Sequence, residues 1–84
     1  DIKIIPNPNT GSFQLELHGV PRPKVELSLW SLEGKLIMDG GAHYFNSGFF
    51  SKPMMFGSIP EGIYFLKIVS LNEETIYKKI IIQN

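Results

Sequence analysis

Two histidines are the residues of this chain best suited to hold a metal or to move a proton near neutral pH. His18 and His43 lie 25 positions apart, and neither has a carboxylate at a ligand-like spacing. A zinc site takes three or four ligands from histidine, cysteine and carboxylate side chains, and the chain has no cysteine. We therefore interpret both histidines as surface side chains and predict no metal site.

The sequence also offers few groups for catalysis. No serine lies in the Gly-x-Ser-x-Gly turn that presents a hydrolase nucleophile. Glu73 and Glu74 are adjacent, and adjacent side chains of an extended chain point apart, so we interpret them as a solvated turn rather than a paired acid and base. Gly40-Gly41 lacks the lysine and the spacing of a phosphate-binding loop. We expect no catalytic residue and no cofactor, and we predict that the domain is not an enzyme.

Length and charge restrict the remaining classes of protein. The chain has 84 residues, enough for one small domain. Hydrophobic residues make up 43% and charged residues 19%, which is typical of a folded domain. Eight basic and eight acidic residues give no net charge, so nucleic acid is not an expected partner. No apolar run approaches ~18 residues, so we expect no transmembrane segment.

Alternating side chains predict two strands in the first half of the chain, at residues 12–17 and 24–31. In each strand every second residue is apolar, which places one set of side chains inward. Residues 32–35 are typical of a tight turn, because their glycine can take a positive φ at no steric cost. We expect a further strand at 35–39, ended by Gly40-Gly41.

The second half of the chain begins less regularly. Residues 43–58 are rich in aromatic side chains and interrupted by glycine and proline, and we expect one or two strands there. Strands at 63–69 and 75–83 flank a polar turn at 70–74. The 63–69 strand is apolar on both faces, which indicates a central strand or one covered by a partner. Short strands without a capped helical period predict an all-β sandwich.

Aromatic residues can form a binding surface where they are exposed. Trp30 falls on the polar side of its strand. Several more aromatic residues follow it: Tyr44, Phe45, Phe49, Phe50 and Phe56. Exposed rings on a sandwich can stack on sugars or form a protein contact. The competing interpretation packs Trp30 beneath residues 43–58, and we favour it because so many exposed rings lower solubility.

The segment ahead of the first predicted strand is stiff. Pro6 and Pro8 fix their own φ, and Pro8 holds Asn7 in an extended geometry. Asn9 and Gly11 favour a turn. We therefore predict a rigid extended segment that turns into that strand and marks the boundary with a preceding domain.

Four blocks of the sequence follow one another in an order known from a protein family. They are Pro6-Asn7-Pro8 with Gly11, Val25-Glu26-Leu27 with Gly34-Lys35, Gly62-Ile63-Tyr64, and Lys78-Lys79-Ile80 with Ile82. Together they resemble the C-terminal sorting domain of cargo of the type IX (Por) secretion system, over nearly the whole chain. Residues 39–58 depart from the family's shorter, more polar connection, which suggests a local binding surface.

This resemblance implies a single C-terminal sorting domain, residues 1–84, with a small immunoglobulin-like antiparallel β-sandwich of about seven strands. It implies a non-enzymatic signal that secretion-machinery proteins recognise, so that the cargo crosses the outer membrane. It also implies an N-terminal cargo domain, a sortase-like peptidase as a second partner, passage through the periplasm, and a final location at the cell surface or in the medium. Since the chain starts at Asp1 without a visible signal peptide, we expect either a fragment of a larger secreted protein, which we favour, or a mature product.

The last predicted strand suggests how such a signal is recognised. Alternation places Ile76, Ile80 and Ile82 on its inner face. We expect the machinery to recognise the folded domain by strand addition at this strand, with Lys78 and Lys79 in contact with the receptor. Alternatively, the two lysines only keep a sheet edge soluble. Two other functions stay open, a carbohydrate- or protein-binding module of a secreted enzyme and a structural spacer between domains.

Overall fold

Seven β-strands make up the part of the chain that the structure, a computed structural model, describes: residues 2–18, 24–44, 49–70 and 74–83. The strands are β1 (Ile2–Ile5), β2 (Ser12–His18), β3 (Lys24–Ser31), β4 (Leu36–Tyr44), β5 (Phe49–Met55), β6 (Gly62–Ser70) and β7 (Thr75–Ile82). These residues include no helix that could cross a membrane. Phe45 and Glu73, considered above, lie outside the described ranges. The predicted all-β fold is confirmed.

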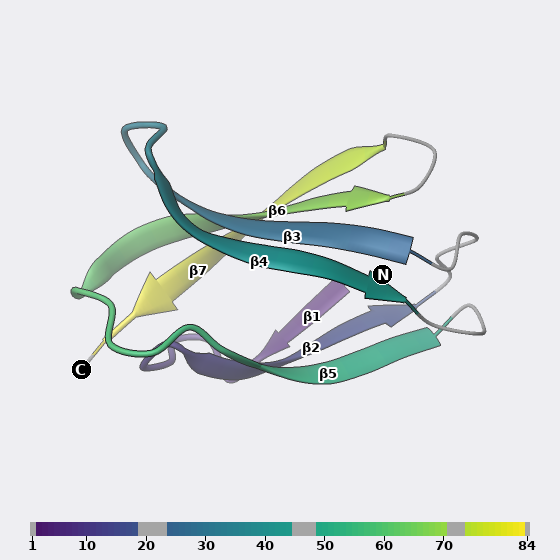
Figure 1. The fold of residues 1–84 in the computed structure, drawn as a ribbon. Helices are drawn as coiled ribbons and strands as arrows, with labels where there is room; N and C mark the ends of the chain where they lie inside the picture. Colours follow the sequence, from purple (N-terminus) through teal and green to yellow (C-terminus); the bar gives the residue numbers. More distant parts are fainter. Residues whose placement is uncertain (1, 19–23, 45–48, 71–73, 84) are drawn as a thin grey trace.

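The strands form two antiparallel sheets that face each other (Figure 1). One sheet has the strand order β1-β2-β5 and the other has the order β4-β3-β6-β7. This is the predicted small immunoglobulin-like sandwich. Because β6 lies between β3 and β7, the prediction of a central strand at residues 63–69 is confirmed.

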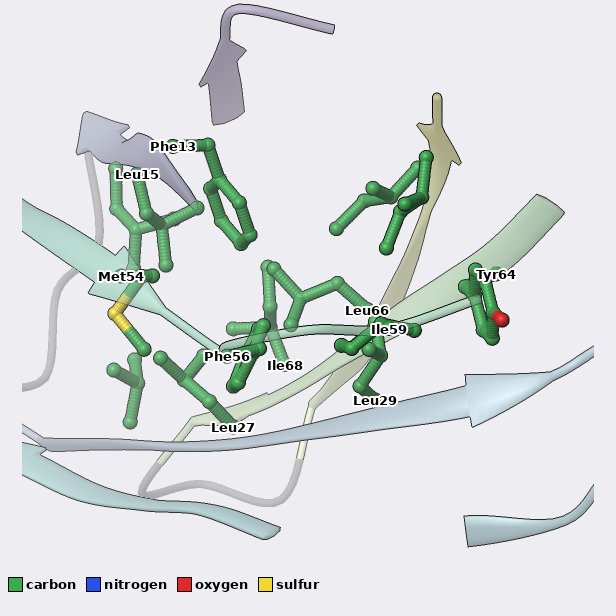
Figure 2. Close-up of a cluster of buried hydrophobic side chains, with 14 of the residues drawn as sticks. Phe13, Leu15, Leu27, Leu29, Met54, Phe56, Ile59, Tyr64, Leu66 and Ile68 are labelled. Carbon is green, nitrogen blue, oxygen red and sulfur yellow. The ribbon is translucent and has the colours of Figure 1, made fainter. Parts of the chain in front are cut away.

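Side chains from both sheets fill the space between them, as Figure 2 shows for part of the core. The buried set follows the alternation seen in the sequence: Phe13, Leu15, Leu17, Val25, Leu27, Leu29, Phe50, Met54, Phe56, Ile59, Tyr64, Leu66, Ile68, Ile80 and Ile82. Burial of one such side chain contributes about 2 kcal/mol. The core therefore depends on the inward residues of nearly every strand.

The expectation that Gly40-Gly41 ends a strand is wrong, because β4 continues through both residues to Tyr44. The register shifts at this point, with Leu27 opposite Gly41 and Ser28 opposite Asp39. Gly41 has a φ of 76°, and its N–H donates to Asp39 Oδ1 at 2.9 Å. The two glycines therefore form a bulge within a strand, where one extra residue is accommodated without ending the pairing.

Residues 43–58 contribute one strand, β5, and the end of β4, as expected. β5 belongs to the three-stranded sheet and buries Phe50 and Met54. The interpretation that Trp30 packs beneath this segment is wrong. Trp30 lies on the outer face of the four-stranded sheet, where it pairs with Leu36 and Phe65 of the neighbouring strands. The reason is strand parity, since Leu29 takes the inward position.

Candidate functional site

A compact turn precedes β2, and the side chain of Asn9 organises it. Asn9 is only 5% exposed. Its Nδ2 donates to the Pro6 carbonyl at 3.0 Å, and its Oδ1 accepts the N–H of Gly11 at 2.9 Å. Gly11 has a φ of 106°, and its carbonyl accepts the N–H of Phe56 at 2.8 Å. The predicted turn is present, and it forms a packed part of the domain.

The same segment lies against the last strand. Asn7 Nδ2 donates to the Lys79 carbonyl at 3.1 Å, and Asn7 Oδ1 accepts the Ile81 N–H at 2.9 Å. The Asn9 N–H donates to the Ile81 carbonyl at 2.9 Å, and the Asn9 carbonyl accepts the Gln83 N–H at 2.8 Å. Asn9 and Ile82 form a parallel bridge. Residues 7–9 therefore extend the four-stranded sheet past β7 and connect the two ends of the domain.

Strand β7 divides into a covered half and an open half. Ile80 and Ile82 are buried, as predicted, and residues 7–9 bond to the edge beside them. Thr75 to Lys79 are exposed, and no other described strand pairs with the outer edge of Thr75–Lys78. Ile76 lies on the predicted inner face, opposite the buried Ile68, but it is 44% exposed and does not anchor the strand in the core. The three-stranded sheet does not cover that part of β7.

The two lysines of β7 point to opposite faces of the sheet. Lys78 lies opposite Leu66, a buried residue of the inner face, and Lys79 lies opposite Phe65 on the outer face. Both side chains are exposed. A receptor can contact both of them only at the edge of β7, since neither face presents the pair.

Tyr64 fixes the chain where it enters β6. Its hydroxyl donates to the Pro60 carbonyl at 2.7 Å, and its ring is buried. Gly62, two residues earlier, lies opposite Ile82, and Tyr64 lies opposite Ile80. The start of β6 therefore supports the covered half of β7.

The turn between β3 and β4 lies at the same end of the sandwich. Gly34 has a φ of 86°, as the predicted turn requires, and its N–H donates to the Ser31 carbonyl at 3.1 Å. The Lys35 N–H donates to Ser31 Oγ at 3.1 Å. An open hollow separates this turn from Gly62 and Tyr64. Figure 1 shows this turn, the start of β6 and the end of β7 together on the left.

The structure therefore gathers most of the predicted site residues at one end of the sandwich. These are Pro6, Asn7, Pro8, Gly11, Gly34, Lys35, Gly62, Tyr64, Ile80 and Ile82. Lys78 and Lys79 lie farther along β7. Sequence reasoning missed the buried role of Asn9, although an asparagine two residues before a glycine is a signal for such a side-chain turn.

Both histidine side chains are partly buried. His43 Nε2 is 2.8 Å from the Gly40 carbonyl, and Lys52 Nζ is 3.2 Å from His43 Nδ1. His18 Nε2 lies 3.5 Å from Glu16 Oε1. Among the described residues, no group of three or more histidine, cysteine, aspartate or glutamate side chains could hold a metal.

The sequence matches one family model along nearly its whole length. Residues 3–83 match the secretion system C-terminal sorting domain, so the chain belongs to this family of type IX sorting domains. Comparison with curated proteins and with solved structures gave no match. The domain is a C-terminal export signal for type IX secretion, and the alternative of a carbohydrate- or protein-binding module is not favoured.

Membership in the family indicates, in general terms, which proteins the domain interacts with and where its cargo is exported. A sorting domain interacts with the type IX machinery and follows a cargo, which is exported to the cell surface or secreted. The family also points to a role as a signal rather than as a catalyst.

Proposed function

We propose that the type IX machinery recognises this domain in its folded state, at the end where residues 6–11 lie against β7. The four hydrogen bonds that join Asn7 and Asn9 to residues 79–83 carry the proposal. They make the position of the last strand depend on the first segment, and both belong to blocks typical of the family. A receptor at this end contacts a shape that exists only in the folded domain.

The open half of β7 supplies a second contact. The outward backbone groups used by residues 7–9 belong to Lys79, Ile81 and Gln83, so by alternation those of Thr75 and Tyr77 also point outward. An extended receptor segment can hydrogen-bond to them as an added strand. Lys78 and Lys79 then flank this strand, one on each face.

The other described edges are less suited to strand addition. β1 has four residues, β4 carries a bulge, and β5 contains Pro53. Short edges, bulges and prolines are the devices by which sheets avoid pairing with other chains. This supports β7 as the edge that the receptor contacts.

In this proposal the chain is the single C-terminal domain of a larger secreted protein. The cargo precedes it and reaches the periplasm first, and the machinery then takes the folded domain to the outer membrane. A sortase-like peptidase then cleaves between the cargo and the domain, on the N-terminal side of β1, which belongs to the sandwich. The domain itself carries no catalytic residue and no cofactor.

An export assay tests the proposal. Residues 1–84 are fused to the C-terminus of a periplasm-directed fluorescent reporter, in bacteria with and without a working type IX system. We expect surface or secreted reporter only where the system works, and we expect deletion of 75–84 to abolish it. A folded fusion that stays in the periplasm of both strains, while native cargo is exported, overturns the assignment for that host.

Two variants separate recognition from folding in the same assay. Lys78→Ala/Lys79→Ala removes both charges from exposed positions, and we expect a folded domain with reduced export. Lys3→Ala, on the exposed part of β1, is the matched control and should be exported normally. Normal export of the double variant leaves the lysines with a solubility role only.

A further inference from the structure

The open half of β7 has a self-complementary sequence. Residues 74–78 are Glu-Thr-Ile-Tyr-Lys, and in a second, antiparallel strand the same residues run Lys-Tyr-Ile-Thr-Glu. Side by side, the two orders place glutamate opposite lysine at both ends and isoleucine opposite isoleucine in the middle. Threonine lies opposite tyrosine at the two remaining positions. Opposite charges, apolar pairs and pairs of an aromatic with a β-branched residue all stabilise antiparallel strands.

The two charges and the central isoleucine lie on one face of the sheet. Ile76 and Lys78 lie opposite buried residues of β6, on the inner face. The ladder to β6 continues one residue before β7, because the Ser70 N–H donates to the Glu74 carbonyl at 3.0 Å. By alternation Glu74 shares the face of Ile76 and Lys78, and all three residues are exposed. A second strand beside β7 would therefore meet a carboxylate, an apolar group and an ammonium group in that order.

The backbone of β7 is in phase with this pairing. Its N–H and C=O groups that point away from β6 belong to odd-numbered residues, among them Thr75 and Tyr77. When Ile76 lies opposite Ile76 of a second copy, Thr75 lies opposite Tyr77 in two places. Each of these two pairs can exchange two backbone hydrogen bonds. The charged residues and the isoleucines then form the non-hydrogen-bonded pairs, in which side chains of opposite strands lie closest together.

Registers shifted by two residues also pair the outward backbone groups, but they match the side chains less well. One shift places Tyr77 opposite itself and Ile76 opposite Lys78, so that an apolar side chain lies against an ammonium group. The other places Thr75 opposite itself and Ile76 opposite Glu74. Neither shift brings Glu74 and Lys78 together. Side-chain complementarity therefore selects the register with Ile76 at its centre.

The other edge strands of the described part lack this complementarity. β1 and β5 each carry one charged residue, a lysine, so pairing two copies of either strand cannot match opposite charges. β4 carries one carboxylate, Asp39, and no lysine or arginine. The open edge of β7 also has the required length, since it extends from Glu74 to Lys79, whose carbonyl accepts the Asn7 side chain at 3.1 Å. Charge and length together therefore distinguish this edge.

We propose that residues 74–78 pair with the same residues of a second copy of this chain, antiparallel and about a two-fold axis at Ile76. The two four-stranded sheets then form one continuous sheet. Two ion pairs between Glu74 and Lys78 fix the register, and the two Ile76 side chains cover each other. A contact of this length is a small interface, so the dimer is weak and reversible.

The dimer occupies the site at which the receptor strand adds. Both use the outward N–H and C=O groups of Thr75 and Tyr77, so one chain cannot hold a second copy and a receptor strand there at once. The second copy thus covers this edge until the receptor displaces it, which also prevents the edge from pairing with unrelated chains. This consequence rests on the function proposed above, whereas the dimer itself does not.

Sedimentation equilibrium of the whole chain tests the pairing. We expect a monomer–dimer equilibrium that is half complete at about 0.1 mM. Glu74→Lys and Lys78→Glu each place like charges opposite one another at both ends, and each should weaken dimerisation about tenfold. An equimolar mixture of the two variants pairs opposite charges again and should dimerise as well as wild type. Lys3→Glu, on the exposed part of β1, is the matched control and should dimerise normally.

Hydrogen exchange shows whether the dimer uses the edge of β7. The amides of Thr75 and Tyr77 should exchange about tenfold more slowly in the wild-type dimer than in the monomer. A chain that stays monomeric up to about 1 mM overturns the proposal. So does a dimer that neither charge reversal weakens, or a mixture of the two variants that dimerises no better than each alone.

The reporter assay tests the competition with the receptor. Glu74→Lys weakens the dimer but leaves Lys78 and the outward backbone groups in place, so its fusion should be exported at least as well as wild type. A folded Glu74→Lys fusion that is exported about tenfold less overturns the competition. Failure of the wild-type fusion instead counts against the function proposed above and not against the dimer, which is measured without the machinery.

Discussion

The side-chain Oδ1 of Asn7 accepts a hydrogen bond at 2.9 Å from the backbone N–H of Ile81, 74 residues later in the chain. The Asn7 Nδ2 donates to the Lys79 carbonyl on the same edge. One asparagine side chain thus takes the place of a peptide group in a neighbouring strand. The block that opens the family pattern and the block that closes it therefore form one structural unit.

Replacing the two asparagines should have unequal effects on stability. Asn9→Ala leaves the Pro6 carbonyl and the Gly11 N–H without their buried partner, and we expect it to lower the free energy of unfolding by about 3 kcal/mol. Asn7→Ala loses two exposed hydrogen bonds, and about 1 kcal/mol is expected. Urea unfolding measures both. Equal losses would contradict the assignment of Asn9 as the buried member.

Much of the core could be predicted from the sequence, because strand parity is a local property. In β2 and β3, the alternation of apolar and polar residues identified the inward side chains, among them Leu15 and Leu27. The turn at Gly34 could be predicted equally well, because glycine adopts a positive φ without help from distant contacts. Patterns among neighbouring residues were therefore sufficient to predict the inward side chains of these strands and the turn between β3 and β4.

The candidate site was less predictable, because its contacts join residues far apart in sequence. Nothing near Asn9 indicates that it is buried against β7. The bulge at Gly40-Gly41 was mistaken for a strand end because only the partner strand shows that pairing continues. Parity correctly placed Trp30 on the polar side of its strand, but the sequence does not show that residues 43–58 leave this face of the sheet uncovered.

Substituting two glycines tests where the backbone conformation and the space around it require a residue without a Cβ. Gly11 has a φ of 106°, and a Cβ there would overlap the carbonyl oxygen of Gly57. We expect Gly11→Ala to cost about 3 kcal/mol. Gly34 also has a positive φ, but a Cβ there meets no atom within 4 Å, so Gly34→Ala should cost about 1 kcal/mol. Thermal unfolding that ranks Gly34→Ala as the worse variant would contradict this geometry.

Removing one hydroxyl tests the support beneath β6. Tyr64→Phe keeps the buried ring and loses the bond to the Pro60 carbonyl, and we expect a loss of about 1 kcal/mol. Tyr44→Phe is the matched control, because Tyr44 is among the most exposed large side chains. Its midpoint in urea should not change. A Tyr64→Phe variant as stable as this control would show that the Pro60 contact contributes nothing.

Two isoleucines of β7 should contribute unequally to the free energy of unfolding. Ile80 is fully buried, so Ile80→Ala removes core volume and should cost about 3 kcal/mol. Ile76→Ala changes a side chain on the open half of the strand and should cost under about 1 kcal/mol. Circular dichroism during urea unfolding gives both values, and similar losses would place Ile76 in the core after all.

Proline substitutions separate the two edges of β7. The N–H groups of Thr75 and Tyr77 point away from β6, whereas those of Ile76 and Lys78 point toward it. Thr75→Pro should therefore leave the β6–β7 ladder intact and cost under about 1 kcal/mol, while Ile76→Pro removes a ladder bond and costs about 3 kcal/mol. If a receptor strand adds at this edge, Thr75→Pro should also reduce export of a domain that remains folded. A Thr75→Pro variant that is both stable and fully exported would argue that recognition does not use the outward N–H of Thr75.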